Sequence, residues 1–262
     1  MNFSEVLNSV SGGGGRWTAA VPDDWVNGRT VFGGLQVALV LRAMRALVPA
    51  QTPLRTLQVV FIAPVPPGKV EVEAKILRSG KSATHVEARI VAGAQTACLV
   101  VAIFGAPRSS IVAVAPPPAR PDKSPAQSVA FPFMPGVTPD FLKYIETSWA
   151  RGGAPFTGQS DPRVQMHSRL RGESAIDECS VVGMADIPPP LGLALLKKPA
   201  MGSSMTWTLE FLSHEFPQGE GWWFIDAELI AARDGYLTQS LMLYGPDGKA
   251  VALSRQAMVM FA

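Results

Sequence analysis

The stretch Val31-Phe32-Gly33-Gly34-Leu35-Gln36-Val37 begins the segment that decides the fold. From Leu35 to Leu47 the residues are apolar on nearly every side, which predicts a buried helix, and Pro49 ends the pattern. A glycine pair directly before a buried helix lets the backbone pack closely against a sheet. The same pair leaves N–H groups open at the helix start, where a carbonyl oxygen or an oxyanion can be held. Both roles stay open for Gly33 and Gly34.

Strands are expected on both sides of this helix in the first half of the chain. The segment from Val70 to Ser79 alternates apolar with charged residues, which is typical of a strand with one buried face. Glycines and prolines separate the strand candidates by connections that are too short for parallel crossovers. The first half therefore predicts one helix against an antiparallel meander, with strands at 16–21, 56–63, 70–79, 83–92 and 95–104.

The second half repeats this order. Arg78-Ser79-Gly80 corresponds to Arg233-Asp234-Gly235, and the strand beginning at Thr56 corresponds to the one beginning at Thr208. The copies differ at one place, because the second has the carboxylate of Asp186 where the first has its small glycines. A duplicated fold with an acid in one copy predicts a single active site. The expected elements are a helix at 175–185 that resumes at 191–196, and strands at 141–150, 163–170, 204–212, 222–232, 235–244 and 250–261.

A proline-rich segment divides the two copies. Residues 115–126 carry five prolines and suit a semi-rigid connection. We expect an N-terminal repeat at 1–114, this linker, and a C-terminal repeat at 127–262.

Composition excludes several classes of protein. The chain has 262 residues, 47% of them hydrophobic and only 17% charged, with a net charge of +2. No basic block indicates a nucleic-acid surface, and no stretch approaches the length of a membrane span. The two cysteines and three histidines lack metal-ligand spacing. The sequence predicts a cytoplasmic globular protein with no metal, no cofactor, no nucleic-acid partner and no signal peptide.

Four segments together resemble the acyl-CoA thioesterase II family, the TesB-like double-hotdog enzymes. They are the glycine-opened helix at 31–37, the strand 59–64, the turn 77–82 and the late strand 254–259. The resemblance runs over residues 15–262. It implies an α+β fold of two hotdog repeats, each with a central helix wrapped by an antiparallel sheet, whose sheets join into one.

The resemblance also implies a catalytic set of an acid, a hydroxyl and a glutamine in the second repeat. The acid matches Asp186 and the glutamine matches Gln256. The hydroxyl matches Ser204, where the family usually has threonine, and Thr206 lies two residues on, where a regular strand would place it on the same face. Either hydroxyl is a candidate. The triple proline at 188–190 also departs from the family and could move the carboxylate.

The expected reaction is hydrolysis of an acyl-CoA to a free acid and coenzyme A. The chain has no Gly-x-Ser-x-Gly nucleophile motif, so the simplest chemistry is a water activated by Asp186, or direct attack by Asp186 itself. Gly33, Gly34, Arg78 and Lys81 are the candidate substrate-binding residues, with Arg108 as a further cation for the phosphates. The alternatives are a non-catalytic acyl-CoA binding protein of the same fold and a hotdog hydratase. We also expect a homo-oligomer.

Overall fold

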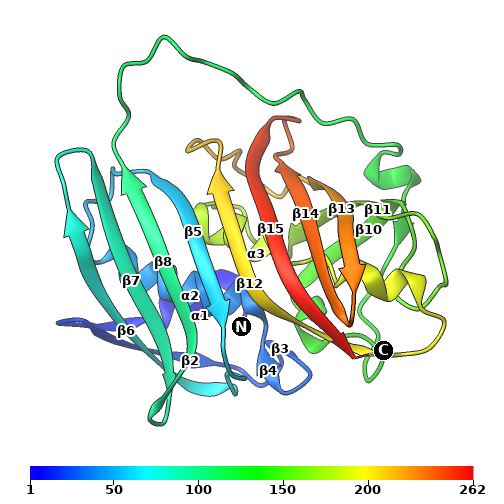
Figure 1. Cartoon of the computed structure of the whole chain (residues 1–262), viewed down its shortest axis with the longest axis horizontal. Helices are drawn as coiled ribbons and strands as arrows, with labels where there is room; N and C mark the ends of the chain where they lie inside the picture. Colours follow the sequence, from blue (N-terminus) through cyan, green and yellow to red (C-terminus); the bar gives the residue numbers. More distant parts are fainter. Residues whose placement is uncertain (262) are drawn as a thin grey trace.

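The computed structural model describes residues 1–261, and its main feature is one curved antiparallel sheet of thirteen strands (Figure 1). The strand order is β1-β2-β6-β7-β8-β5-β12-β15-β14-β13-β11-β10-β9. A separate hairpin holds β3 and β4. The strands are β1 (Ser11–Gly13), β2 (Arg16–Val21), β3 (Val26–Asn27), β4 (Thr30–Val31), β5 (Leu54–Phe61), β6 (Gly68–Ser79), β7 (Ala83–Ala92), β8 (Gln95–Gly105), β9 (Val129–Ala130), β10 (Ile145–Arg151), β11 (Arg163–Leu170), β12 (Met201–Phe211), β13 (Trp223–Arg233), β14 (Tyr236–Tyr244) and β15 (Ala250–Phe261).

The sheet order confirms the duplication. The first half runs β2-β6-β7-β8-β5, and the second half runs β11-β13-β14-β15-β12 in the same chain sequence. The two halves meet where β5 pairs with β12 at the centre of the sheet, with Leu57 opposite Leu209. This is the arrangement expected of a double hotdog, in which two sheets join edge to edge.

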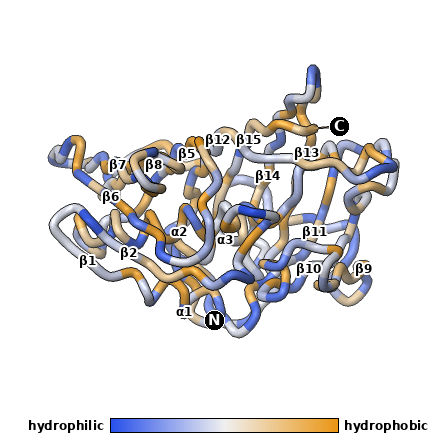
Figure 2. Tube along the Cα trace, turned by 90° about the horizontal axis from the view of Figure 1, so that it is seen from below, coloured by the Kyte–Doolittle hydropathy of each residue, from blue (hydrophilic) through white to orange (hydrophobic). Residues whose placement is uncertain are grey.

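Two helices lie side by side inside the curve of the sheet (Figure 2). They are α2 (Gly33–Arg45) and α3 (Glu178–Ala185), and a short helix α1 (Phe3–Asn8) packs near them. The apolar residues of α2 are buried all round, as its sequence predicts. The guanidinium of Arg45 forms an ion pair with Glu178, which ties the end of α2 to the start of α3. The sheet and the helices therefore enclose one continuous core.

The second helix is shorter than the expected span of 175–185. It begins at Glu178 because Asp177 caps it by accepting a hydrogen bond from the Ser180 N–H at 3.0 Å. After the prolines at 188–190 the chain forms a 3₁₀ turn, η3 (Leu191–Leu195), and not a resumed α-helix. The first part of the strand expected at 141–150 is also wrong, because Asp140–Tyr144 forms a 3₁₀ turn, η2, before β10.

Residues between β8 and the 3₁₀ turn η1 (Pro125–Gln127) form a long irregular connection above the sheet (Figure 1). Its second part is attached to the C-terminal repeat, because the Ala119 N–H donates to the Gly248 carbonyl and the Asp122 N–H donates to Gln165 Oε1, both at 2.9 Å. The division of the chain at residues 114 and 127 stays a prediction. None of the helices in residues 1–261 has the length and apolar character that crossing a membrane requires.

Candidate active site

Asp186 lies directly after α3, where it forms the C-cap of that helix. The residue keeps a small part of its surface open to solvent, but dense packing surrounds the carboxylate. Desolvation by this packing raises the pKa of Asp186 from 3.8 to about 7, against the opposing effects of hydrogen bonds from the Gln256 side chain and the Gly34 N–H. A carboxyl group with this pKa exchanges its proton near neutral pH.

A chain of two hydrogen bonds leads from the sheet to this carboxylate. Gln256 on β15 is buried, and its Nε2 donates to Asp186 Oδ1 at 2.6 Å. The Ser204 hydroxyl on β12 donates to Gln256 Oε1 at 3.3 Å. These bonds fix the orientation of the Gln256 amide, because its oxygen accepts and its nitrogen donates. The structure therefore brings together three of the four residues expected to be catalytic, and with the prolines at 188–190 present the Asp186 carboxylate is within hydrogen-bonding distance of Gln256.

The expectation that Thr206 shares the face of Ser204 is wrong. A β-bulge interrupts β12 between them, so that Ser204 pairs with Met258 but Thr206 pairs with Ala257. Met258 faces the core, whereas Ala257 belongs to the opposite face, and the Thr206 side chain is exposed. The inserted residue, Met205, has shifted the alternation by one position. Ser204 is thus the hydroxyl that reaches Gln256.

The glycine pair lies against the carboxylate. A Cβ atom built on Gly33 would lie 2.7 Å from Asp186 Oδ2, and one built on Gly34 would lie 3.1 Å from Asp186 Cβ. The comparison of the two copies suggested that the glycines and the acid occupy equivalent positions of the repeats. The structure shows that they do not. Gly33 begins α2, whereas Asp186 follows the end of α3, and the two positions meet in space. The site is built from both repeats.

Cys98 is a neighbour of Asp186 that the sequence did not single out. It is buried on β8 opposite Phe61 of β5, and Phe61 lies beside Gly33. Burial, with a smaller effect of the Asp186 charge, raises the pKa of the Cys98 thiol to about 12. The thiol stays protonated at neutral pH and cannot serve as a nucleophile there. Only the pairing of β5 with β8 reveals this neighbour, and no local sequence signal marks it.

Two family models match the chain. The acyl-CoA thioesterase N-terminal domain matches residues 21–105, and the acyl-CoA thioesterase C-terminal domain matches residues 117–260.

The chain belongs to the acyl-CoA thioesterase family. It is a thioesterase, and the expected double-hotdog fold is confirmed. A search of curated protein sequences gave no significant match.

Solved structures similar to this thioesterase share its fold over the whole chain. A hot dog protein of unknown function from Alicyclobacillus acidocaldarius has a TM-score of 0.85 and 22% identity, covering 99% of this chain and 98% of its own. The tesB protein of Mycobacterium avium subs paratuberculosis has a TM-score of 0.80 and 15% identity, covering 99% and 100%. The acyl-CoA thioesterase II TesB2 of Mycobacterium marinum has a TM-score of 0.76 and 17% identity, covering 99% and 98%.

The remaining candidate residues of this thioesterase lie away from Asp186. Arg78 and Lys81 are exposed at the hairpin between β6 and β7. The β7 end of that hairpin pairs with Gly105 at the end of β8, whereas the residue of β8 next to Asp186 is Cys98. Seven residues of a strand span about 23 Å. The structure therefore does not bring these two cations into the site around Asp186.

Proposed function

We propose that this thioesterase hydrolyses acyl-CoA thioesters by means of a water molecule that Asp186 deprotonates. The observation that carries the proposal is the hydrogen-bonded chain from Ser204 through Gln256 to a carboxylate whose pKa is raised to about 7. A general base is most effective when its pKa lies near the working pH. The raised pKa favours a proton acceptor over a carboxylate that attacks the thioester directly.

Gln256 and Ser204 hold the base in position. Gln256 Nε2 donates a hydrogen bond to Asp186 Oδ1, so we assign the other carboxylate oxygen, Oδ2, to the attacking water. Gln256 has a second N–H, which can donate to the same water or to the substrate. Ser204 is a positioning residue in this scheme, since its hydroxyl fixes the amide and does not contact Asp186. This limits the rotation of the base, which supports attack from one direction.

The start of α2 supplies hydrogen-bond donors for the negative charge that develops on the thioester oxygen. The first N–H groups of a helix have no partners within that helix, and its dipole favours negative charge there. Gly33 carries such a group next to Asp186 without a side chain to cover it, whereas the Gly34 N–H donates to the Asp186 carboxylate. An oxyanion hole at this place would stabilise the negative charge on the oxygen of the same carbonyl group whose carbon the water attacks.

The direct test is thiol release from a panel of acyl-CoAs of increasing chain length. The proposal expects turnover with at least one of them. The alternative, a non-catalytic acyl-CoA binding protein of the same fold, expects saturable binding by calorimetry with no thiol release from any. Loss of absorbance from an enoyl-CoA would instead indicate a hydratase.

The pH dependence of the reaction follows from the environment of Asp186. We expect kcat/KM to rise with pH along an acid limb whose apparent pKa is about 7, because the base must lose its proton before it can accept one from water. In Gln256→Met the donor that lowers this pKa is absent, so the acid limb should move to higher pH. An acid limb near the ordinary carboxyl value in both proteins would contradict the assignment.

The bulge in β12 allows Ser204 to be separated from Thr206. Ser204→Ala removes a hydrogen bond to Gln256, and we expect kcat to fall about 5- to 10-fold. Thr206→Ala changes an exposed side chain on the other face and should leave kcat unchanged. Steady-state kinetics with one acyl-CoA suffices. Equal losses in both variants would show that the two hydroxyls act alike and that the bulge has no role.

Three further proposals concern the protein as a whole. We propose that the chain acts in the cytoplasm, that it forms a homo-oligomer of double-hotdog units, and that its repeats are divided at 114 and 127. Analytical ultracentrifugation tests the oligomeric state, and limited proteolysis tests the division, because cleavage should then be confined to residues 115–126.

A further inference from the structure

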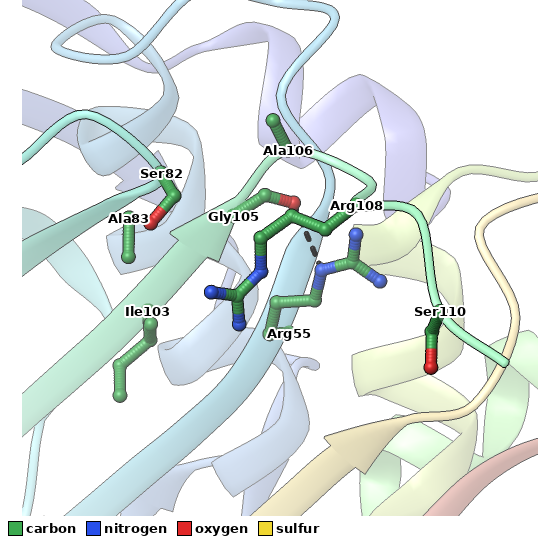
Figure 3. Close-up of a pocket in the computed structure, with 8 residues that line it drawn as sticks. All are labelled: Arg55, Ser82, Ala83, Ile103, Gly105, Ala106, Arg108 and Ser110. Carbon is green, nitrogen blue, oxygen red and sulfur yellow. Dashed lines mark hydrogen bonds between the residues drawn. The ribbon is translucent and has the colours of Figure 1, made fainter. Parts of the chain in front are cut away.

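A cavity of about 440 Å³ opens at one end of the central strands, where β8 ends and β5 begins (Figure 3). Its wall includes Arg55, Ser82, Ile103, Gly105, Arg108 and Ser110. Ile103 belongs to the outer face of the sheet, since its neighbours Ala102 and Phe104 are buried. Asp186 and Gln256 lie on the inner face, and Cys98, the neighbour of Asp186 on β8, is about 17 Å along that strand from Ile103. The cavity is therefore separate from the site around Asp186.

The charged groups of the cavity are all basic. Arg55 and Arg108 both line the cavity, and Figure 3 shows their guanidinium groups pointing in opposite directions, that of Arg108 toward Ile103 and that of Arg55 toward Ser110. Within residues 1–261 no carboxylate lines the cavity, and neither arginine makes an ion pair. Arg55 Nε donates to the Gly105 carbonyl at 2.8 Å, which fixes its position while other N–H groups of the fork stay available.

A histidine adds a third basic group beside the cavity. Arg55 Nη1 contacts His214 Nε2. A guanidinium can only donate, so the imidazole nitrogen accepts and His214 is neutral. Burial and the Arg55 charge both lower the pKa of His214. An anion bound at the guanidinium groups would reverse the second effect, and the imidazole could then take a proton and donate to the anion as well.

We propose that this cavity binds the phosphate group of a small phosphate ester. A doubly charged tetrahedral anion suits two arginine forks and an imidazole that can gain a proton. The cavity volume lies in the range of small-molecule sites and exceeds what an inorganic ion needs, so the organic part of an ester can enter too. The phosphate can belong to coenzyme A itself or to another phosphate ester. The first possibility rests on the proposed function, and the second is independent of it.

The test uses the full chain and the NMR signals of its three histidines. Inorganic phosphate and adenosine 3′,5′-bisphosphate, a fragment of coenzyme A, are titrated separately. The expected result is a rise in the pKa of His214 on binding, with affinity lowered at least about 10-fold in Arg108→Gln. Arg233→Gln is the matched control, because it removes an exposed guanidinium at the opposite end of the sheet and should bind as the wild type does. Arg108→Gln is preferred to a change at Arg55, which holds the Gly105 carbonyl.

An unchanged His214 signal with both ligands up to about 10 mM would overturn the proposal, as would equal affinity in Arg108→Gln and the wild type. Kinetics then identify the source of the phosphate. A higher KM of Arg108→Gln for an acyl-CoA, with an unchanged KM for the matching acyl-pantetheine, assigns the cavity to coenzyme A. Unchanged KM values for both, together with phosphate binding, assign it to a separate ester. Absence of all thiol release would contradict the proposed function and leave the binding result standing.

Discussion

Asp186→Asn is expected to lower kcat/KM for acyl-CoA hydrolysis by ~10²–10⁴-fold, the usual contribution of a general base. Asparagine has nearly the same shape as aspartate, and its side-chain oxygen can still accept the Gln256 amide hydrogen at the position of Oδ1. It cannot accept a proton from water near neutral pH. Thiol release measured at saturating and at low substrate concentration gives both kcat and kcat/KM, and activity equal to that of the wild type would end the proposed role of Asp186.

The same variant has an effect on stability that separates loss of chemistry from loss of fold. Asp186 has a pKa of about 7 in the folded chain and an ordinary value of 3.8, so between these pH values the folded state binds more protons than the unfolded state. The free energy of unfolding of the wild type therefore falls as pH rises through this range. Asparagine does not titrate, so the Tm of the variant relative to the wild type should increase between about pH 5 and about pH 8. Thermal unfolding at the two pH values measures it.

Asp226→Asn is the matched control for the activity measurement. Asp226 lies on β13, and burial raises its pKa as well. It faces Gln165 and the arginines of the neighbouring strands, away from Gln256, so activity should stay at the wild-type level. An equal loss of activity in both variants would mean that any change to a buried carboxylate harms the enzyme.

The architecture could be predicted because both halves of the sequence contain the same order of helix, strands and turns. Alternation in Val70–Ser79 and the turns that contain Gly80 and Gly235 are local signals, and short connections between strands force neighbours to pair antiparallel. The order of strands in each half then follows from the order along the chain. That the two sheets join into one was predicted only from the resemblance to a family, which rests on whole segments of the sequence.

The geometry of the site could be predicted only in part. Asp186 and Gln256 follow from the resemblance, but the face on which Thr206 lies depends on the bulge at Met205, which no turn residue marks. The approach of Gly33 to Asp186 depends on how α2 and α3 pack across the two repeats, which is a contact between residues 153 positions apart. Long-range packing of this kind leaves no periodic pattern in the sequence.

Gly33→Ala is expected to lower kcat by ~10²-fold, because an added methyl group would collide with the carboxylate that we propose as the general base. The new Cβ would lie 2.7 Å from Asp186 Oδ2 and 3.2 Å from Phe61 Cζ, both closer than normal contact. The backbone of Gly33 has no left-handed conformation, so alanine fits the helix itself and would otherwise favour it by ~0.5–1 kcal/mol. The collision must instead move Asp186 or the start of α2, and a displacement of about 1 Å in an active site can cost 10²-fold in rate.

The result shows whether the close approach of Gly33 to Asp186 matters only for packing or also for the reaction. A purely structural role predicts that the overpacked helix loses ~1–3 kcal/mol of stability while the folded fraction keeps its kcat. A functional role predicts a lower kcat with an altered acid limb of the pH profile, since the Asp186 carboxylate has moved relative to Gln256 and to the N–H groups of α2. Gly13→Ala, where the added Cβ meets no atom within 4 Å, should change neither quantity. A Gly33→Ala enzyme with the kcat and pH profile of the wild type would contradict a role of the carboxylate next to Gly33 in the reaction.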